Sequence, residues 1–186
     1  MGIRQFIFDG KSQTGNNIFG KMLSWLDSPL RLKYDDPQKL VQAAGIQAGQ
    51  TVLEIGCGNG FFTPSISRLL GKDGRLYATD LHPVAVEETR RKVAELGLDN
   101  VIVQLEDGMH TGFADAMFDA VLLYGVVPAP VISMPVISRE IYRLLKPGGI
   151  YAIWTKIPLW QPEEALKAAV FEKLPGQNGV FRLRKC

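Results

Sequence analysis

The sequence is poor in cysteine, and neither sign of charge is in large excess. Only Cys57 and Cys186 occur among its 186 residues, so a disulfide framework is not expected and a reducing cytoplasm is the natural compartment. The formal net charge is +2, which is too small to indicate a nucleic-acid partner. These shortages argue against a disulfide-stapled secreted module and against a strongly basic nucleic-acid-binding protein.

Long uninterrupted apolar runs are also absent. No stretch approaches the length of a transmembrane helix, and the N-terminus lacks the apolar core of a signal peptide. We therefore expect a cytoplasmic protein without a membrane span. Its 186 residues, 46% hydrophobic and 22% charged, suit one globular domain with a full core. The sequence does not indicate an oligomeric state.

What the sequence does contain is a set of three glycines at alternate positions after an apolar run. Residues 51–55 are typical of a buried parallel strand, and Gly56, Gly58 and Gly60 follow it, ahead of helix-forming sequence. Glycine has no Cβ, so the turn can be tight and a ligand can approach its backbone. Because a following helix directs free N–H groups at the turn, we predict a cofactor-binding loop at the carboxyl end of a first strand.

The spacing of these glycines differs from the dinucleotide fingerprint Gly-x-Gly-x-x-Gly. The third fingerprint position holds Phe61, whose ring would obstruct close packing of helix on strand, and the glycine comes one residue early, at Gly60. Glu54, two residues before the first glycine, is also foreign to that fingerprint. An NAD-dependent oxidoreductase is therefore the less favoured reading.

Strand and helix patterns alternate from Thr51 onward, which predicts a parallel sheet with crossover helices. Two short runs around a turn-rich segment near the end predict an antiparallel hairpin. The expected strands are 51–55, 75–79, 101–105, 118–124, 150–155, 170–174 and 180–184. The expected helices are 61–70, 83–97, one across 137–145 that Pro147-Gly148-Gly149 stops, and 162–169.

The first 36 residues form a separate segment in this interpretation. Apolar residues recur at helical spacing across 18–26, which predicts a helix packed on the core, with a substrate-covering lid as the alternative. We expect the catalytic domain to span residues 37–186.

The pattern from Glu54 to Gly60 resembles motif I of the class I S-adenosylmethionine-dependent methyltransferases. Four further sequence motifs of that family match in order. They are Asp80 at the end of the second strand, Asp107-Gly108 after the third strand, 118–121 at the start of the fourth strand and 144–149 before the fifth strand. The chain most resembles the small type 11 and quinone-biosynthesis-like methyltransferase domains, from about residue 37 to its end. The resemblance implies a Rossmann-like, doubly wound, mostly parallel seven-stranded sheet, closed by a C-terminal antiparallel hairpin, with S-adenosylmethionine as cofactor.

The resemblance also implies roles for individual residues. The glycine loop would hold the methionine moiety, and Asp80 would accept hydrogen bonds from the ribose hydroxyls. A carboxylate placed for the dipole of the next helix is the alternative for Asp80, and an ordinary turn pair is the alternative for Asp107-Gly108. The expected cofactor-binding residues are Glu54, Gly56, Cys57, Gly58, Gly60, Asp80, Leu81, Asp107, Gly108, Met109 and Tyr124.

The methyl acceptor cannot be read from the sequence. No residue is marked as a general base, so no catalytic residue is assigned, and no metal site is expected. The place where enzymes acting on exocyclic base nitrogens carry Asn/Asp-Pro-Pro-aromatic holds 124–128, which reads Tyr-Gly-Val-Val-Pro. The apolar loop with Pro128, Pro130 and Pro135 suggests a small apolar or aromatic acceptor, in contact with Tyr34 and Val126. Rigidity of the connection between strand and helix is the alternative reason for these prolines. A non-catalytic S-adenosylmethionine-binding or interaction domain is the alternative function.

Overall fold

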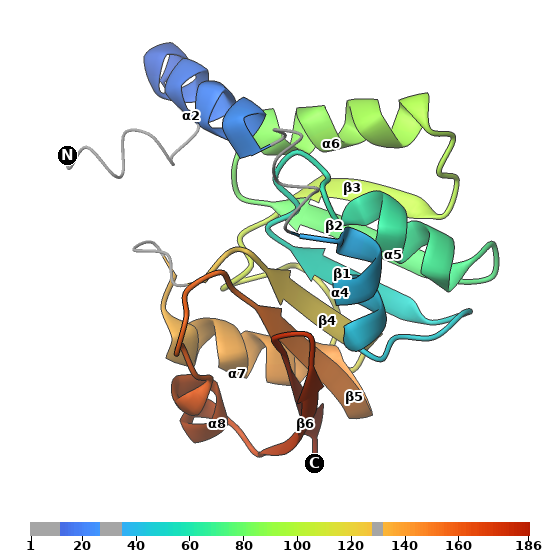
Figure 1. Cartoon of the computed structure of the whole chain (residues 1–186), viewed down its shortest axis with the longest axis vertical. Coiled ribbons are helices and arrows are strands. Elements are labelled where there is room, and N and C mark those ends of the chain that lie inside the picture. Colours follow the sequence, from blue (N-terminus) through green and yellow to red (C-terminus); the bar gives the residue numbers. More distant parts are fainter. Residues whose placement is uncertain (1–11, 27–34, 128–131) are drawn as a thin grey trace.

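A single seven-stranded sheet organises the protein. The computed structural model describes residues 12–26, 35–127 and 132–186, with the side chains of all of these except 22–26. The strand order is β3-β2-β1-β4-β5-β7-β6, with β1 to β5 parallel and β6 and β7 antiparallel (Figure 1). The predicted fold class is therefore confirmed. The strands are β1 (Thr51–Ile55), β2 (Arg75–Asp80), β3 (Val101–Leu105), β4 (Phe118–Tyr124), β5 (Leu145–Trp154), β6 (Phe171–Gln177) and β7 (Val180–Lys185).

Helices cover both faces of the sheet (Figure 1). Helices α4 and α5 pack on one face, α7 and α8 pack on the other, and α6 lies along β2 and β3, with α2 against it. No helix in the described ranges is long and apolar enough to cross a membrane. The bounds are α2 (Gln13–Leu26), α4 (Pro37–Ala43), α5 (Thr63–Leu70), α6 (Pro83–Glu95), α7 (Met134–Leu144) and α8 (Glu163–Ala168).

The alternation of side chains along the central strands creates two apolar cores. Because β1 and β4 are in parallel register, Val52 lies beside Ala120 and Leu53 beside Val121. Val52 and Ala120 face α4 and α5, whereas Leu53 and Val121 face α7. All four side chains are almost completely buried, as the near-continuous apolar sequence of central parallel strands requires.

Two strand boundaries differ from the sequence prediction by more than one residue, both at glycines. Strand β5 begins at Leu145, not at Ile150, because 145–149 forms an irregularity in the pairing with β4, where Gly148 has φ +76°. Strand β6 continues through Pro175-Gly176 with a register shift, and the hairpin turns at Asn178 and Gly179, both with positive φ. An Asn-Gly pair with two positive φ angles is the turn that fits the twist of a hairpin.

The buried face of α6 includes a polar side chain. Val86 and the polar Thr89 are buried, whereas Leu96 is 47% exposed. Burial is concentrated in the N-terminal half of α6, where Phe19 of α2 packs against Ala85. This end of α6 lies directly after β2, at the carboxyl edge of the parallel strands.

Candidate functional site

The glycine loop after β1 adopts a conformation that requires its glycines. Gly56, Gly58 and Gly60 have φ angles of +77°, +58° and +73°. The N–H groups of Gly56 and Cys57 both donate to the carbonyl of Thr79, at 2.8 and 2.9 Å, which joins the loop to the end of β2. A Cβ added at Gly56 would run into the side chain of Val126, beyond the end of β4. The loop is therefore a bare stretch of main chain between β2 and the segment that follows β4.

Asp80 connects this loop to the turn after β2. Its Oδ2 accepts a hydrogen bond from the N–H of Gly58 at 3.0 Å, and its Oδ1 accepts one from the N–H of His82 at 2.9 Å. Burial raises the pKa of Asp80, and these backbone donors act in the opposite direction. A carboxylate oxygen can accept more than one hydrogen bond, so each retains capacity for a ligand hydroxyl. The structure thus brings together two of the predicted cofactor residues and orients the carboxylate.

The side chain of Glu54 is buried beneath the glycine loop. Its Oε2 accepts a hydrogen bond of 2.7 Å from the hydroxyl of Thr63, in the first turn of α5, and its side chain is buried. Burial raises the pKa of Glu54 to about 8, and the nearby charge of Asp80 adds to the rise. The carboxyl of Glu54 is therefore mostly protonated at neutral pH, and it joins β1 to the start of α5.

Cys57 is buried within the same loop. Burial raises the pKa of its thiol, and the charges of Glu54 and Asp80 act in the same direction. A thiolate is the reactive form of cysteine, so this environment disfavours nucleophilic chemistry. The side chain of Cys57 is a packing element of the loop.

The turn after β3 lies at the same edge of the sheet. Asp107 Oδ1 accepts a hydrogen bond from the N–H of Met109 at 2.9 Å, which folds the turn. A Cβ added at Gly108 would lie 2.5 Å from Cγ2 of Ile55, so the turn packs closely against the end of β1. Leu81, directly after Asp80, is 47% exposed and offers an apolar surface at this edge.

Tyr124, which is among the cofactor-binding residues expected from the sequence, lies inside the core. Its side chain is buried, and its hydroxyl donates to the carbonyl of Leu40 in α4 at 3.0 Å. Its ring also contacts Phe62, edge to face, at 5.2 Å between centroids. Tyr124 thus joins α4 to the end of β4. Tyr34, Pro128 and Pro130 lie outside the described residues.

Two supporting residues have no clear signal in the sequence. The hydroxyl of Thr63 donates to Glu54, and that of Thr89 donates to the carbonyl of Gly58 at 2.9 Å. Each is a polar residue at a position where the helical pattern of apolar residues predicts a buried side chain, and this is the only signal in the sequence for a supporting role. His82 caps α6 through Nδ1 and is buried, whereas His110 is exposed.

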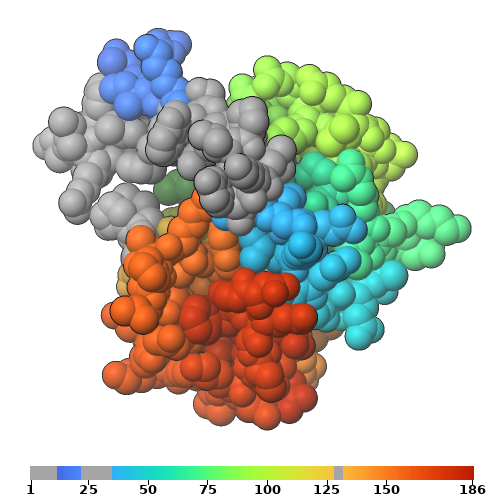
Figure 2. Space-filling model, in the orientation of Figure 1, coloured from blue at the N-terminus to red at the C-terminus, as the bar shows by residue number. Residues whose placement is uncertain are grey.

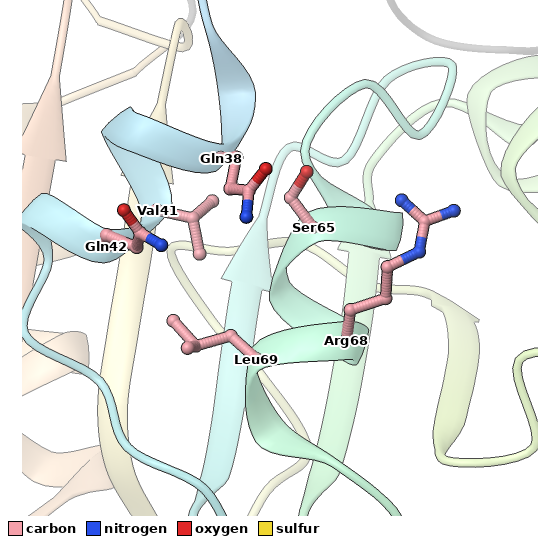
Figure 3. Close-up of a pocket in the computed structure, with 6 residues that line it drawn as sticks. All are labelled: Gln38, Val41, Gln42, Ser65, Arg68 and Leu69. Atoms are coloured by element: carbon pink, nitrogen blue, oxygen red, sulfur yellow. The ribbon is translucent and has the colours of Figure 1, made fainter.

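A groove of about 200 Å³ lies elsewhere, between α4 and α5 (Figure 3). It shares no residue with the edge described above. Its lining residues are Gln38, Val41, Gln42, Ser65, Arg68 and Leu69.

The edge combines three features that fit one kind of ligand. The glycine loop has partly exposed main chain without a side chain at Gly56 and Gly58, Asp80 can accept hydrogen bonds from hydroxyls, and Leu81 can contact a planar ring. In an open parallel sheet, ligands bind at the carboxyl ends of the strands, next to the point where strand order reverses, here between β1 and β4. The arrangement is that of a nucleoside-binding methyltransferase fold.

Comparison with known proteins gives the family. The sequence profile of the methyltransferase domain family matches residues 52–149, just over half of the chain. The chain belongs to this family and is a class I S-adenosylmethionine-dependent methyltransferase, with S-adenosylmethionine as its cofactor.

Named relatives and a solved structure agree with this assignment. The chain is 28% identical to a protein-L-isoaspartate O-methyltransferase of Methanococcus maripaludis, over 84% of this chain and 79% of the relative. It is 31% identical to the ubiquinone/menaquinone biosynthesis C-methyltransferase UbiE of Klebsiella pneumoniae, over 73% of this chain but only 55% of that enzyme. A crystal structure of an S-adenosylmethionine-dependent methyltransferase from Aquifex aeolicus has a TM-score of 0.72 and 27% identity, over 89% of this chain and 96% of that one.

Proposed function

We propose that this enzyme binds S-adenosylmethionine across the carboxyl edge of β1, β2 and β3 and transfers its methyl group to a small apolar or aromatic acceptor. The observation that carries the cofactor site is the carboxylate of Asp80, which is held by the N–H groups of Gly58 and His82 beside the exposed Leu81.

The residues at this edge suit the parts of the cofactor. Asp80 would accept hydrogen bonds from the ribose hydroxyls, and Leu81, with the turn of Asp107, Gly108 and Met109, would contact the adenine. The bare main chain from Gly56 to Gly60 would lie along the methionine moiety. Glu54 and Cys57 would act from below by shaping the loop, because both side chains are buried.

Catalysis in this proposal depends on alignment. S-adenosylmethionine, when bound, supplies a methyl group activated by its sulfonium. The chain must orient the acceptor toward that methyl and exclude water, and such positioning contributes roughly 7–11 kcal/mol to lowering a barrier. Glu54 and Cys57 are buried under the loop, and both oxygens of Asp80 accept backbone hydrogen bonds, so we assign no general base among these residues. An acceptor that arrives deprotonated needs none.

A small acceptor is supported by the surroundings of the loop. The apolar Val126 lies against Gly56, so the wall next to the methionine end is apolar. The UbiE relatives, named for ubiquinone and menaquinone biosynthesis, are consistent with an acceptor of this kind. A protein acceptor is the second candidate, since a relative that matches 84% of this chain is named protein-L-isoaspartate O-methyltransferase.

Calorimetry with S-adenosylhomocysteine tests the cofactor site. Asp80→Ala removes the carboxylate, and loss of hydrogen bonds to a charged group weakens binding by about 1.5–3 kcal/mol, or roughly 10- to 150-fold. Asp73→Ala is the matched control, because Asp73 is an exposed aspartate just before the opposite end of β2. Equal affinity of Asp80→Ala and the native enzyme would show that the ribose assignment is wrong.

A transfer assay with labelled donor separates the two acceptor classes. One arm contains quinols and phenols, and the other contains an isoaspartyl peptide with its aspartyl isomer as control. Product in the first arm supports the small acceptor, and product in the second arm alone overturns it. Donor binding without product in any arm would favour the non-catalytic alternative, which the comparisons do not favour.

The location of the protein and its division into segments are also proposals. We propose a cytoplasmic location, which fits two free cysteines, one buried and one exposed. We also propose the division into an N-terminal segment, residues 1–36, and a catalytic domain from residue 37, where α4 begins.

A further inference from the structure

Helix α2 contacts the edge of the cofactor site through one aromatic pair. The ring of Phe19 stacks on the imidazole of His82, with centroids 3.7 Å apart and planes inclined by 15°. Phe19 is 6% exposed and His82 is 2% exposed, so the pair is almost completely enclosed. His82 is two residues after Asp80, in the turn between β2 and α6. The N-terminal helix is thereby in contact with the turn that carries the proposed ribose ligand.

His82 fixes this turn at both ends. Its backbone N–H donates to Oδ1 of Asp80 at 2.9 Å, and its Nδ1 accepts from the N–H of Val84 at 3.2 Å. The first bond orients the carboxylate, and the second caps α6. Both bonds belong to one residue, so a contact that fixes His82 also constrains the turn whose backbone N–H orients Asp80.

Helix α2 approaches α6 closely at this point. Phe19 packs with Ala85 and Val84, and a Cβ added at the next residue, Gly20, would lie 3.7 Å from Cγ1 of Val84. Ile18, on the same helix, is 44% exposed. Figure 1 shows α2 next to the start of α6, and Figure 2 shows both helices at the end of the molecule opposite the C-terminal strands. Phe19 is thus the described side chain of α2 that is buried against the turn after β2.

We propose that Phe19 is a positioning residue for the methyl donor: its stacking on His82 holds the turn from Asp80 to Val84 in the geometry that binds ribose. The proposal rests on the cofactor site proposed above. If Phe19 has this role, the packing of α2 on the turn and the binding of the donor favour each other, because each stabilises the same conformation of the turn. Such coupling is reciprocal, so the donor must also stabilise the docked helix.

The first test measures the affinity for S-adenosylhomocysteine by calorimetry. Phe19→Leu keeps an apolar side chain without the ring, and Phe19→Ala removes the contact. We expect affinity to fall about 5-fold or more in Phe19→Leu, at the lower end of typical coupling, and further in Phe19→Ala. Ile18→Ala, on the exposed side of the same helix, is the matched control and should bind as the native enzyme does.

The second test observes the stack and the helix directly. The chain has two histidines, so the ring-proton NMR signals of buried His82 and exposed His110 can be distinguished. Loss of the Phe19 ring should move the His82 signal and leave that of His110 in place. In the native enzyme, S-adenosylhomocysteine should slow cleavage by trypsin after Lys21, within α2.

The outcomes separate this inference from the proposed function. If Phe19→Leu moves the His82 signal but binds S-adenosylhomocysteine with native affinity, Phe19 is a packing residue only and the proposal is overturned. The same holds if the ligand does not protect Lys21 in the native enzyme. If the ligand binds the native enzyme and Asp80→Ala equally, the ribose assignment fails first, and the inference fails with it.

Discussion

Glu54 is an ionisable residue whose side chain is buried in the protein. Glu54 is 2% exposed, and this burial favours the protonated carboxyl, whereas the hydrogen bond that it accepts from Thr63 acts in the opposite direction. Its folded-state pKa is about 8, against a usual value of 4.5. The residue therefore contributes to the shape of the glycine loop and makes the stability of the fold depend on pH.

The first prediction concerns that pH dependence, measured by urea unfolding without ligand. Between pH 4.5 and 8 the folded chain retains a proton on Glu54 that the unfolded chain has lost, so stability falls as pH rises. The slope is at most about 1.4 kcal/mol per pH unit, and it vanishes for this group above pH 8. Glu54→Gln keeps an acceptor for Thr63 and removes the titration.

The raised pKa of Glu54 predicts the sign of the difference in unfolding free energy between Glu54→Gln and the native protein. Glu54→Gln should be more stable than the native protein at pH 8 and should show a flatter profile between pH 5 and 8. A shallow slope will remain, because burial also raises the pKa of Asp80. Parallel profiles for the two proteins would mean that Glu54 is ionised in the fold.

A second residue-scale prediction concerns Leu159, in the turn after β5. Its φ is +64° and its side chain is 96% exposed, so it has a strained backbone and no packing to offset the strain. Asparagine tolerates this conformation better than leucine. Leu159→Asn should therefore raise the free energy of unfolding by about 0.5–1 kcal/mol.

The control for Leu159 is its neighbour Ile157. This residue is 52% exposed, and its φ is not positive. Ile157→Asn should change stability by less than about 0.5 kcal/mol, as surface substitutions usually do. An equal gain in both variants would assign the effect to lost apolar exposure rather than to relief of strain.

At the scale of elements, one side chain joins the end of α5 to the start of β3. Nδ2 of Asn100 donates to the carbonyls of Ser67 and Gly71, at 3.0 and 2.8 Å, and its Oδ1 accepts from the hydroxyl of Ser67 at 2.6 Å. Each of these carbonyls also accepts a backbone N–H, Ser67 from Gly71 at 3.1 Å and Gly71 from Gly74 at 3.2 Å, so Asn100 adds a second partner that joins this helix end to β3.

Asn100→Ala should lower the free energy of unfolding by about 2–3 kcal/mol, because it removes three hydrogen bonds at roughly 1 kcal/mol each. Chemical denaturation gives the value. Asp99→Ala is the control, since Asp99 is exposed and adjacent. A loss in Asn100→Ala no larger than in Asp99→Ala would contradict the role of Asn100 as a link between elements.

The elements themselves were largely predictable from local patterns. Strands β1, β3 and β4 match their predicted bounds, and α6 begins at Pro83 as predicted. The misses are longer strands, where β5 begins at Leu145 and β6 passes through Pro175-Gly176. Glycine and proline predicted breaks there, but pairing with neighbouring strands carried the backbone through as bulges.

At the scale of the whole molecule, ligand binding and folding are linked. A ligand that binds only the folded chain stabilises it by about 2.7 kcal/mol at 100 times its Kd. S-adenosylhomocysteine should therefore raise the free energy of unfolding of the native enzyme. Gly56→Ala should largely abolish this gain, because its Cβ would push Val126 and distort the loop.

Gly49→Ala is the matched control for the strain alone. Gly49 has φ +80°, close to the +77° of Gly56, but nothing lies within 4 Å of its added Cβ. Both variants should lose stability, and only Gly56→Ala should lose the response to ligand. The measurement is unfolding with and without S-adenosylhomocysteine, and an intact response in Gly56→Ala would contradict the loop assignment.

The sequence by itself determined the strands, their order along the chain, the glycine loop and the acids that follow β2 and β3. These follow from local rules: the periodicity of apolar residues, the conformations open to glycine and the shared edge of parallel strands. Only the tertiary structure decided that the hydroxyl of Tyr124 bonds to α4, that Thr63 donates to Glu54 and that Phe19 stacks on His82. Each joins side chains from different elements, and such contacts depend on how helices lie on the sheet, which no local pattern specifies.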